Sequence, residues 1–335
     1  MKDLLSLDLE QLKTIVTELD GKPFMGGQLQ QWLSKGVPFE DMTNLPKALR
    51  ETLRNGYTEG YAGVVEKHGS ADGTVKLLLS MAGGGMVECV VMRYNYGNTL
   101  CVSTQVGCRM GCVFCASGKE GLVRNLTIGE MRSEFIAAQQ MGEIGNVVLM
   151  GSGEPLDNYD NVIGFIRTLG ELHGLSIRHI SLSTCGLVPG IEKLAGEGLP
   201  VTLCISLHSA IDERRRQIMP TASAFPVKRI LTAADAYFQK TGRRVIIEYT
   251  LIRYFNDGPE DIDALEGALK GMNCHINVIP LNMAGEGALQ PPSTAETHRF
   301  AGVLEKRGLS ATVRRSLGSD IEGACGQLKL KREKL

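Results

Sequence analysis

The sequence predicts an α/β protein whose main domain is a parallel sheet, closed or partly closed as a barrel. From about residue 98 onward, short β-branched runs alternate with segments long enough for a crossover helix, such as residues 128–141 and 227–240. Repeated βα units of this kind pack as parallel sheets. Before residue 55, apolar residues instead recur at helical spacing, as at Leu5, Leu9 and Leu12, which predicts a small helical domain in front.

The length of 335 residues allows a large domain and a small one, because single cores seldom exceed about 250–300 residues. We expect a helical domain at residues 1–58. A β-hairpin extension is expected at 59–97, where two apolar runs flank the glycines at 83–85. The barrel then covers 98–318, and residues 319–335 form a C-terminal segment.

Seven apolar runs are the predicted barrel strands, and they cover residues 100–104, 146–150, 179–184, 201–207, 244–251, 275–280 and 311–314. In parallel barrels the chemistry lies at the C-terminal ends of the strands. Small or polar groups follow four of these runs: Gly153 and Glu154; Ser183; Ser206, Leu207 and His208; and Asn282. Each group alone is compatible with an ordinary turn or a structural residue. Because such groups recur at the ends of several strands, they together predict a polar ligand bound across the open end of the barrel.

Composition excludes several classes of protein. No apolar run approaches the roughly 20 residues of a membrane span, and the acidic, leucine-rich start is not a signal peptide. We therefore expect a cytoplasmic protein without membrane attachment. Nine cysteines in a reducing compartment indicate metal binding or thiol chemistry rather than structural disulfides.

The formal net charge of −1 removes any global attraction to nucleic acid. RNA binding would therefore depend on local basic clusters, each of which can equally be a solvated face. The candidates are residues 214–216, 228–229, 243–244, 314–315 and the tail at 329–334.

The most informative motif is the CxxxCxxC spacing of Cys108, Cys112 and Cys115, with glycines at 107 and 111 that let the loop wrap. Three thiolates can hold three corners of a four-iron cluster and leave one iron open for a small molecule. A zinc site completed by a distant histidine and a set of inert thiols are the alternatives from spacing alone.

Two further cysteines and one acid stand out. Cys325 lies in a loop of small residues near the C-terminus, where an exposed thiol is a candidate nucleophile. Cys101 lies in the first predicted barrel strand, just before the cysteine loop, and Glu88 interrupts an apolar run as either an outward strand position or a buried base. The remaining cysteines, at positions 89, 185, 204 and 274, are expected to be small core residues.

These motifs together resemble the RlmN/Cfr family of radical S-adenosylmethionine (SAM) RNA adenosine methyltransferases. The resemblance covers nearly the whole chain and includes residues 42–47, 101–108, 121–126, 153–155, 181–184, 206–208 and 324–328. It implies a partial (β/α)6 radical SAM barrel with an RNA-binding helical domain in front. The RlmN branch is favoured by the motif at 153–158 and by the strand at 98–104.

The resemblance also implies cofactors and contacts. Cys108, Cys112 and Cys115 would hold a [4Fe-4S] cluster, whose open iron would bind the amino and carboxylate groups of SAM. The family's SAM contacts match Gly153, Glu154, Ser183, Ser206, Leu207, His208 and Asn282. Two SAM molecules would be used in each turnover.

In the family mechanism, one SAM methylates the residue matching Cys325, and a 5′-deoxyadenosyl radical from the second SAM removes hydrogen from that S-methyl group. The methylene radical then adds to an adenine ring carbon. Cys101 matches the thiol that resolves the RNA–protein link by a transient disulfide with Cys325, and Glu88 matches the general base.

The implied substrates are an adenosine in the peptidyl-transferase centre of 23S rRNA and the tRNA adenosine 3′ of the anticodon, methylated at C2. The alternatives are Cfr-like C8 methylation, methylation of a different RNA, and a redox or zinc-stabilised RNA-binding module without methyl transfer. A flavodoxin- or ferredoxin-type electron donor and a monomeric state are expected. Residues 24–28, where relatives carry Arg and Lys, and Met283 in the motif at 281–283 depart from the family pattern.

Overall fold

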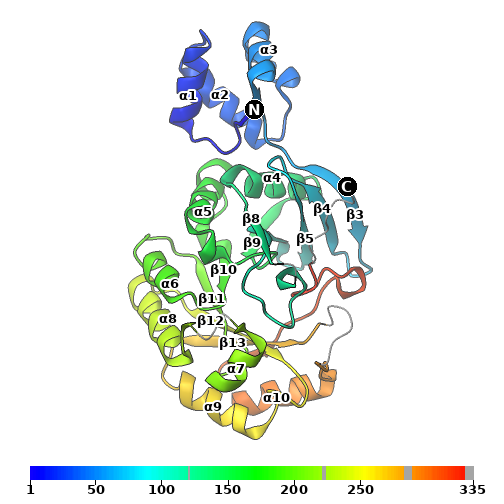
Figure 1. The fold of residues 1–335 in the computed structure, drawn as a ribbon, viewed down its shortest axis with the longest axis vertical. Helices are drawn as coiled ribbons and strands as arrows, with labels where there is room; N and C mark the ends of the chain where they lie inside the picture. The colour runs from blue at the N-terminus through cyan, green and yellow to red at the C-terminus, as the bar shows by residue number, and fades with distance from the viewer. Residues whose placement is uncertain (120, 221–223, 283–288, 329–335) are drawn as a thin grey trace.

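The computed structural model describes residues 1–119, 121–220, 224–282 and 289–328. The basic tail at 329–334 and the departure at Met283 therefore lie outside the described residues. Within them, ten strands form one sheet in the order β14-β13-β12-β11-β10-β9-β6-β5-β4-β3. Figure 1 shows this sheet curving through the main body, with the first three helices set apart at one end.

The barrel part of the sheet is parallel, and its strands are β6 (Gly97–Cys101), β9 (Ile144–Leu149), β10 (Ile180–Thr184), β11 (Thr202–Ser206), β12 (Val245–Leu251), β13 (Cys274–Pro280) and β14 (Ala311–Val313). Helices follow the first six of these strands: α4 (Ile128–Gln139), α5 (Tyr159–His173), α6 (Val188–Leu194), α7 (Asp212–Ile218), α8 (Val227–Thr241), α9 (Pro259–Leu269) and α10 (Thr294–Lys306). The predicted partial (β/α)6 barrel is confirmed, and β14 adds a short seventh parallel strand in the described chain.

The extension continues the same sheet with antiparallel strands β3 (Gly63–Gly69), β4 (Val75–Ser80) and β5 (Met86–Tyr94). The predicted hairpin at 74–92 corresponds to β4 and β5, and β3 is a third strand that the sequence pattern did not single out. A small ribbon of β7 (Gln105–Gly107) and β8 (Leu122–Asn125) encloses the cysteine motif.

The front of the chain folds as α1 (Leu9–Glu18), α2 (Phe24–Ser34) and α3 (Lys47–Gly56), with β1 (Lys2–Asp3) paired to β2 (Tyr57–Thr58). Asp8 caps α1 by accepting a hydrogen bond from the backbone of Gln11, and Thr127 caps α4 in the same way from Glu130. None of the helices in the described ranges is long and apolar enough to cross a membrane.

Candidate active site

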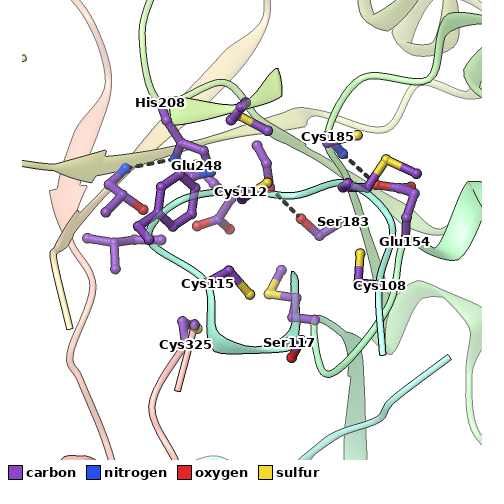
Figure 2. A pocket seen from close by; sticks show the side chains of 18 of the residues that line it. Cys108, Cys112, Cys115, Ser117, Glu154, Ser183, Cys185, His208, Glu248 and Cys325 are labelled. Atoms are coloured by element: carbon purple, nitrogen blue, oxygen red, sulfur yellow. Dashed lines mark hydrogen bonds between the residues drawn. The ribbon is translucent and has the colours of Figure 1, made fainter. Parts of the chain in front are cut away.

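A cavity of about 150 Å³ opens at the C-terminal ends of the barrel strands. The predicted site residues that line it are Cys108, Cys112, Cys115, Gly153, Glu154, Ser183, Ser206, His208, Asn282 and Cys325. Figure 2 shows the three motif thiols arranged around one space, with Cys325 beside Cys115. Tertiary folding therefore brings the cysteine motif, four strand ends and the C-terminal segment to one place.

The cysteine loop is fixed from two sides. The backbone N–H of Val113 donates to the carbonyl of Ile218 at 3.0 Å, which ties the loop to the end of α7. Arg109 forms two hydrogen bonds of 2.8 Å with the Asp157 carboxylate, in the loop after β9. Bidentate guanidinium–carboxylate pairs define geometry as well as adding energy. The loop therefore holds its thiols in a set orientation.

The three thiols perturb one another. Burial raises the pKa of Cys108 to about 12, and the neighbouring Cys115 adds to the shift. Burial also raises the pKa of Cys112 and of Cys115, and for Cys112 both other motif thiols contribute. Without a metal these groups are protonated, and a bound metal would replace the protons.

The donor set fits an iron–sulfur cluster. Within the described ranges, no three His, Cys, Asp or Glu side chains converge in the geometry of a single metal ion. A four-iron cluster instead takes one thiolate on each of several irons, so its ligands are spread around a cavity. Cys108, Cys112 and Cys115, which all line this cavity, would supply three such positions, and a four-iron cluster held by them would keep one iron without a protein thiolate.

Glu154 joins two strand ends at the pocket wall. Its Oε2 accepts a hydrogen bond from the backbone of Cys185 at 2.7 Å, and its Oε1 accepts one from Leu156 at 3.0 Å. Burial raises the pKa of Glu154, and these backbone donors oppose the shift. Gly153 before it has a φ of 107°, and a Cβ there would lie 2.7 Å from Gln105, so glycine lets the two loops meet.

His208 presents one nitrogen to the pocket. Its Nδ1 accepts a hydrogen bond from the backbone of Thr250 at 2.9 Å, which leaves Nε2 as the protonated nitrogen of the neutral ring. Burial lowers the pKa of His208 to about 3, with the positive charge of Arg215 adding to the shift. His208 is therefore an uncharged donor at neutral pH, packed edge-on against the ring of Phe114.

The C-terminal segment is bonded directly to the cysteine loop. The backbone N–H of Ala116 donates to the carbonyl of Gly326 at 2.8 Å, and the Ser117 hydroxyl donates to the carbonyl of Leu328 at 2.7 Å. From the barrel side, Asn282 donates to the carbonyl of Cys325 at 3.2 Å. These contacts place the Cys325 thiol in the cavity with the motif cysteines.

Cys101 and Cys325 meet at a second, smaller cavity. Both thiols line it, together with Arg314 and Arg315. All nine cysteines fall within the described residues and all are free thiols. Glu88 is buried on β5 outside the main pocket, and the Leu207 side chain lies in the hydrophobic core rather than in the pocket wall.

Sequence reasoning did not place three of the cavity residues at the site, although Arg314 was named as part of a basic cluster. Glu248 on β12 is buried and forms an ion pair with the partly buried Arg314 after β14, with an N–O distance of 3.5 Å, at the cavity wall. Glu248 interrupts an apolar strand, and that signal, which singled out Glu88, could have found it. Cys185, expected as a core residue, is only half-buried and also lines the cavity.

Members of two basic clusters that were expected as candidate RNA contacts bond to other parts of the protein. Arg215 is fully buried and donates to the carbonyl of Leu207 at 3.0 Å, which supports the end of β11. Arg214 pairs with the buried Asp261 at 2.5 Å. Arg244 donates to the carbonyl of Cys274 at 2.6 Å. These arginines therefore stabilise the fold through hydrogen bonds and an ion pair with other parts of the chain.

Comparison with protein-family models gives two matches, one to the N-terminal helical domain and one to most of the barrel. Residues 102–265 match the radical SAM superfamily. Residues 2–58 match the ribosomal RNA large subunit methyltransferase N-terminal domain.

Curated relatives align over almost the full chain. A probable dual-specificity RNA methyltransferase RlmN of Clostridium perfringens strain 13 is 48% identical and covers 98% of this chain and 97% of its own length. The protein with the same name from Alkaliphilus oremlandii is 47% identical and covers 98% of each chain. A solved radical SAM methyltransferase from Sphaerobacter thermophilus superposes with a TM-score of 0.95 at 38% identity, over 99% of this chain and 100% of its own.

Proposed function

The chain belongs to the RlmN family of radical SAM RNA methyltransferases, and from this premise we propose that it methylates C2 of an adenosine in 23S rRNA and in tRNA. The observation that supports this most is the position of Cys325, which shares one cavity with the three cysteines of the CxxxCxxC motif. A methyl-carrying thiol must reach both the sulfonium donor and the site of radical formation. A shared cavity meets that requirement.

The proposed cofactors match the residues present. Cys108, Cys112 and Cys115 would hold the [4Fe-4S] cluster, and the cluster would supply the electron that splits SAM homolytically. A flavodoxin- or ferredoxin-type protein is the proposed electron source. One SAM is used to methylate Cys325 and a second to activate that methyl group.

The proposed SAM contacts come from the chain around the cavity. Gly153 offers backbone at close approach, and the Glu154 carboxylate borders the cavity. Ser183 and Ser206 are hydrogen-bonded to each other at 3.2 Å and present their hydroxyls at adjacent strand ends. His208 supplies a neutral N–H donor and Asn282 also lines the cavity, whereas Leu207, the remaining proposed contact, has its side chain in the core beside them.

Glu88 and Cys101 are proposed to complete the reaction after the methylene group has been joined to the adenine ring. Glu88 takes the proton from the ring carbon, and the unpaired electron that radical addition leaves on the ring would return to the cluster. The Cys101 sulfur then attacks the Cys325 sulfur: an S–S bond forms, the S–C bond breaks, and the carbon takes its electron pair and a proton to become a methyl group. Burial raises the pKa of Cys101 to about 12, so this thiol must lose its proton as it attacks.

Nucleoside mass spectrometry tests the proposed product. RNA from cells with and without the gene is digested, and 2-methyladenosine is expected only when the gene is present. Finding 8-methyladenosine instead would assign the Cfr-like reaction, and finding neither modified nucleoside in rRNA or tRNA would refute the proposal.

Metal analysis tests the proposed cofactor separately. Protein reconstituted without oxygen is expected to hold about four irons and to release 5′-deoxyadenosine from SAM under reductant. Zinc without iron, combined with retained RNA binding, would instead support an RNA-binding module that transfers no methyl group.

A further inference from the structure

Lys76 is a buried charged side chain outside the main cavity, on β4 of the extension. It is only 7% exposed, and a buried ammonium is unfavourable unless it is paired. Its Nζ lies 3.1 Å from the Glu88 Oε1 on β5 and donates to the carbonyl oxygen of Glu322 at 3.3 Å. One ammonium therefore links a strand of the extension to the C-terminal segment.

The strand register places Lys76 and Glu88 on the side of the sheet that holds Cys101. Lys76 pairs with Val90, and Val90 packs with Cys101 in a small apolar cluster. Glu88 is two residues from Val90 and so shares its face, because side chains alternate along a strand. The intervening Cys89 belongs to the main core on the opposite face.

The extension also holds the turn that precedes Cys325. The Ser70 hydroxyl donates to the Asp320 carboxylate at 2.6 Å, and the backbone N–H of Gly318 donates to Asp72 at 2.9 Å. Both contacts bridge the β3–β4 turn to the C-terminal segment. The position of that segment is therefore set from the extension as well as from the cysteine loop.

Glu322 has an unfavourable backbone conformation. Its φ of 52° lies in the left-handed region that non-glycine residues rarely adopt, and such conformations persist where surrounding contacts hold them. The Lys76 ammonium accounts for one of those contacts, at the Glu322 carbonyl. Glu322 lies three residues before Cys325. The carbonyl that accepts the Lys76 hydrogen bond therefore belongs to the same turn as the Cys325 thiol.

We propose that Lys76 is a positioning residue: anchored by the Glu322 carbonyl, it holds the Glu88 carboxylate in place relative to the segment that carries Cys325. This rests on the proposed function, in which Glu88 accepts a proton after Cys325 has been joined to RNA. A proton acceptor must be placed within reach of the proton it takes. The 3.1 Å contact between the Lys76 Nζ and the Glu88 Oε1 fixes the position of that carboxylate.

Three variants test the role. Lys76→Met removes the charge while keeping a long side chain, and Lys76→Arg keeps the charge. As a control, Lys67→Met makes the same lysine-to-methionine substitution at an exposed position on β3. We expect Lys76→Met to slow RNA methylation about 100-fold, because positioned acid–base groups contribute about 100-fold or more. Lys76→Arg should recover most of the rate, and Lys67→Met should match the unchanged protein.

The stage that stalls separates positioning from a general loss of structure. Lys76→Met should still bind iron, cleave SAM and form S-methylcysteine at Cys325, as measured by peptide mass spectrometry. The covalent protein–RNA adduct should accumulate, because the failing step comes after its formation. Equal losses at every stage, or a normal methylation rate, would overturn the proposal.

A double variant covers the case in which Lys76→Met does not fold. Glu88→Gln together with Lys76→Met leaves no unpaired buried charge. It should methylate RNA within about threefold of Glu88→Gln alone, because residues acting through each other are not additive. A further large loss would show that Lys76 does not act through Glu88. If the unchanged protein forms neither S-methylcysteine nor methylated RNA, the proposed function itself has failed, which is a distinct result.

Discussion

The N-terminal helices and the C-terminal segment are attached to the barrel in different ways. The N-terminal helices have their own apolar core, which includes Leu12, Leu29 and Leu53. Among the described residues, Ile136 of α4 joins this core from the barrel, and hydrogen bonds such as that from the Gly129 N–H to the Ser6 hydroxyl at 3.0 Å also cross the junction. The C-terminal segment has little core of its own. Leu317 and Leu328 pack beside Cys101, and the remaining described contacts are individual hydrogen bonds and one ammonium.

This difference indicates which substitutions each junction with the barrel, the N-terminal and the C-terminal one, can tolerate. Apolar burial adds up over many contacts, so the loss of one contact lowers stability without moving the rest of the domain. A segment fixed by separate hydrogen bonds depends on each of them for its position. We therefore expect changes at the N-terminal junction to alter stability and changes at the C-terminal junction to alter catalysis.

The largest effect is expected at Cys325. Cys325→Ala should abolish RNA methylation, a loss of at least about 1000-fold, because removing a covalent catalyst removes its reaction path. Nucleoside mass spectrometry after single turnover measures it, with the buried Cys274→Ala on β13 as the matched control. Normal methylation by Cys325→Ala would remove the proposed intermediate.

The N-terminal junction is tested by Ile136→Ala. Ile136 is 6% exposed, and truncating a buried isoleucine costs about 2–4 kcal/mol of the free energy of unfolding. Denaturant unfolding measures the loss. Ile262→Ala on α9 makes the same truncation within the barrel, and only Ile136→Ala should speed hydrogen exchange in α1–α3. Equal exchange in both variants would contradict a separate N-terminal core.

The same junction should weaken in acid through His173, whose Nε2 is buried without a hydrogen-bond partner. Burial, with the positive charge of Arg132 adding to it, lowers the pKa of His173 from 6.5 to about 4. Between these values the unfolded chain binds a proton that the folded protein excludes, so stability is full above about pH 6.5 and falls as pH drops toward 4.

His173→Phe should remove this dependence and improve stability at pH 5 by about 1–2 kcal/mol relative to its effect at pH 7.5. Thermal unfolding at the two pH values checks it, and the exposed His298→Phe is the control. An identical effect of His173→Phe at both pH values would contradict the assignment.

The smallest effect on stability is expected at Asp72, which accepts a hydrogen bond from Gly318 in the C-terminal segment. Asp72→Ala should cost about 0.5–1 kcal/mol in unfolding yet slow RNA methylation about fivefold, since it loosens the segment carrying Cys325. Asp41→Ala, an exposed acid in the N-terminal domain, is the control. A loss of stability without any loss of rate would remove the contrast between the junctions.

Much of the fold could be predicted because each strand and helix is encoded locally. The apolar run at 244–251 became β12, and the helical segments at 128–141 and 227–240 became α4 and α8. The first barrel strand was predicted to begin at residue 100, whereas β6 begins at Gly97. The start was missed because its first three residues are a glycine and two polar residues. β3 was missed because its side chains are mostly exposed.

The candidate site was predicted unevenly for a similar reason. Cys108, Cys112 and Cys115 stand out by spacing, and Cys325 entered through its exposed small-residue loop and the family resemblance. Glu248 was missed, and Arg314 was considered only as part of a basic cluster, because 66 residues separate the two partners and nothing in the sequence pairs them. Lys76 was missed because a lysine on a strand usually faces solvent.

By itself, the order of residues determined the elements, the thiol motif and the family, because these depend on periodicity and spacing along the chain. Only the tertiary structure decided that Cys325 shares a cavity with the motif thiols, that Cys101 meets Cys325 at a second cavity, and that Lys76 pairs with Glu88. Such contacts join strands and loops far apart in the chain. They form because the sheet curves and because the extension bonds to the turn that precedes Cys325. A buried charge is unfavourable unless it is paired, which favours the contact between Lys76 and Glu88.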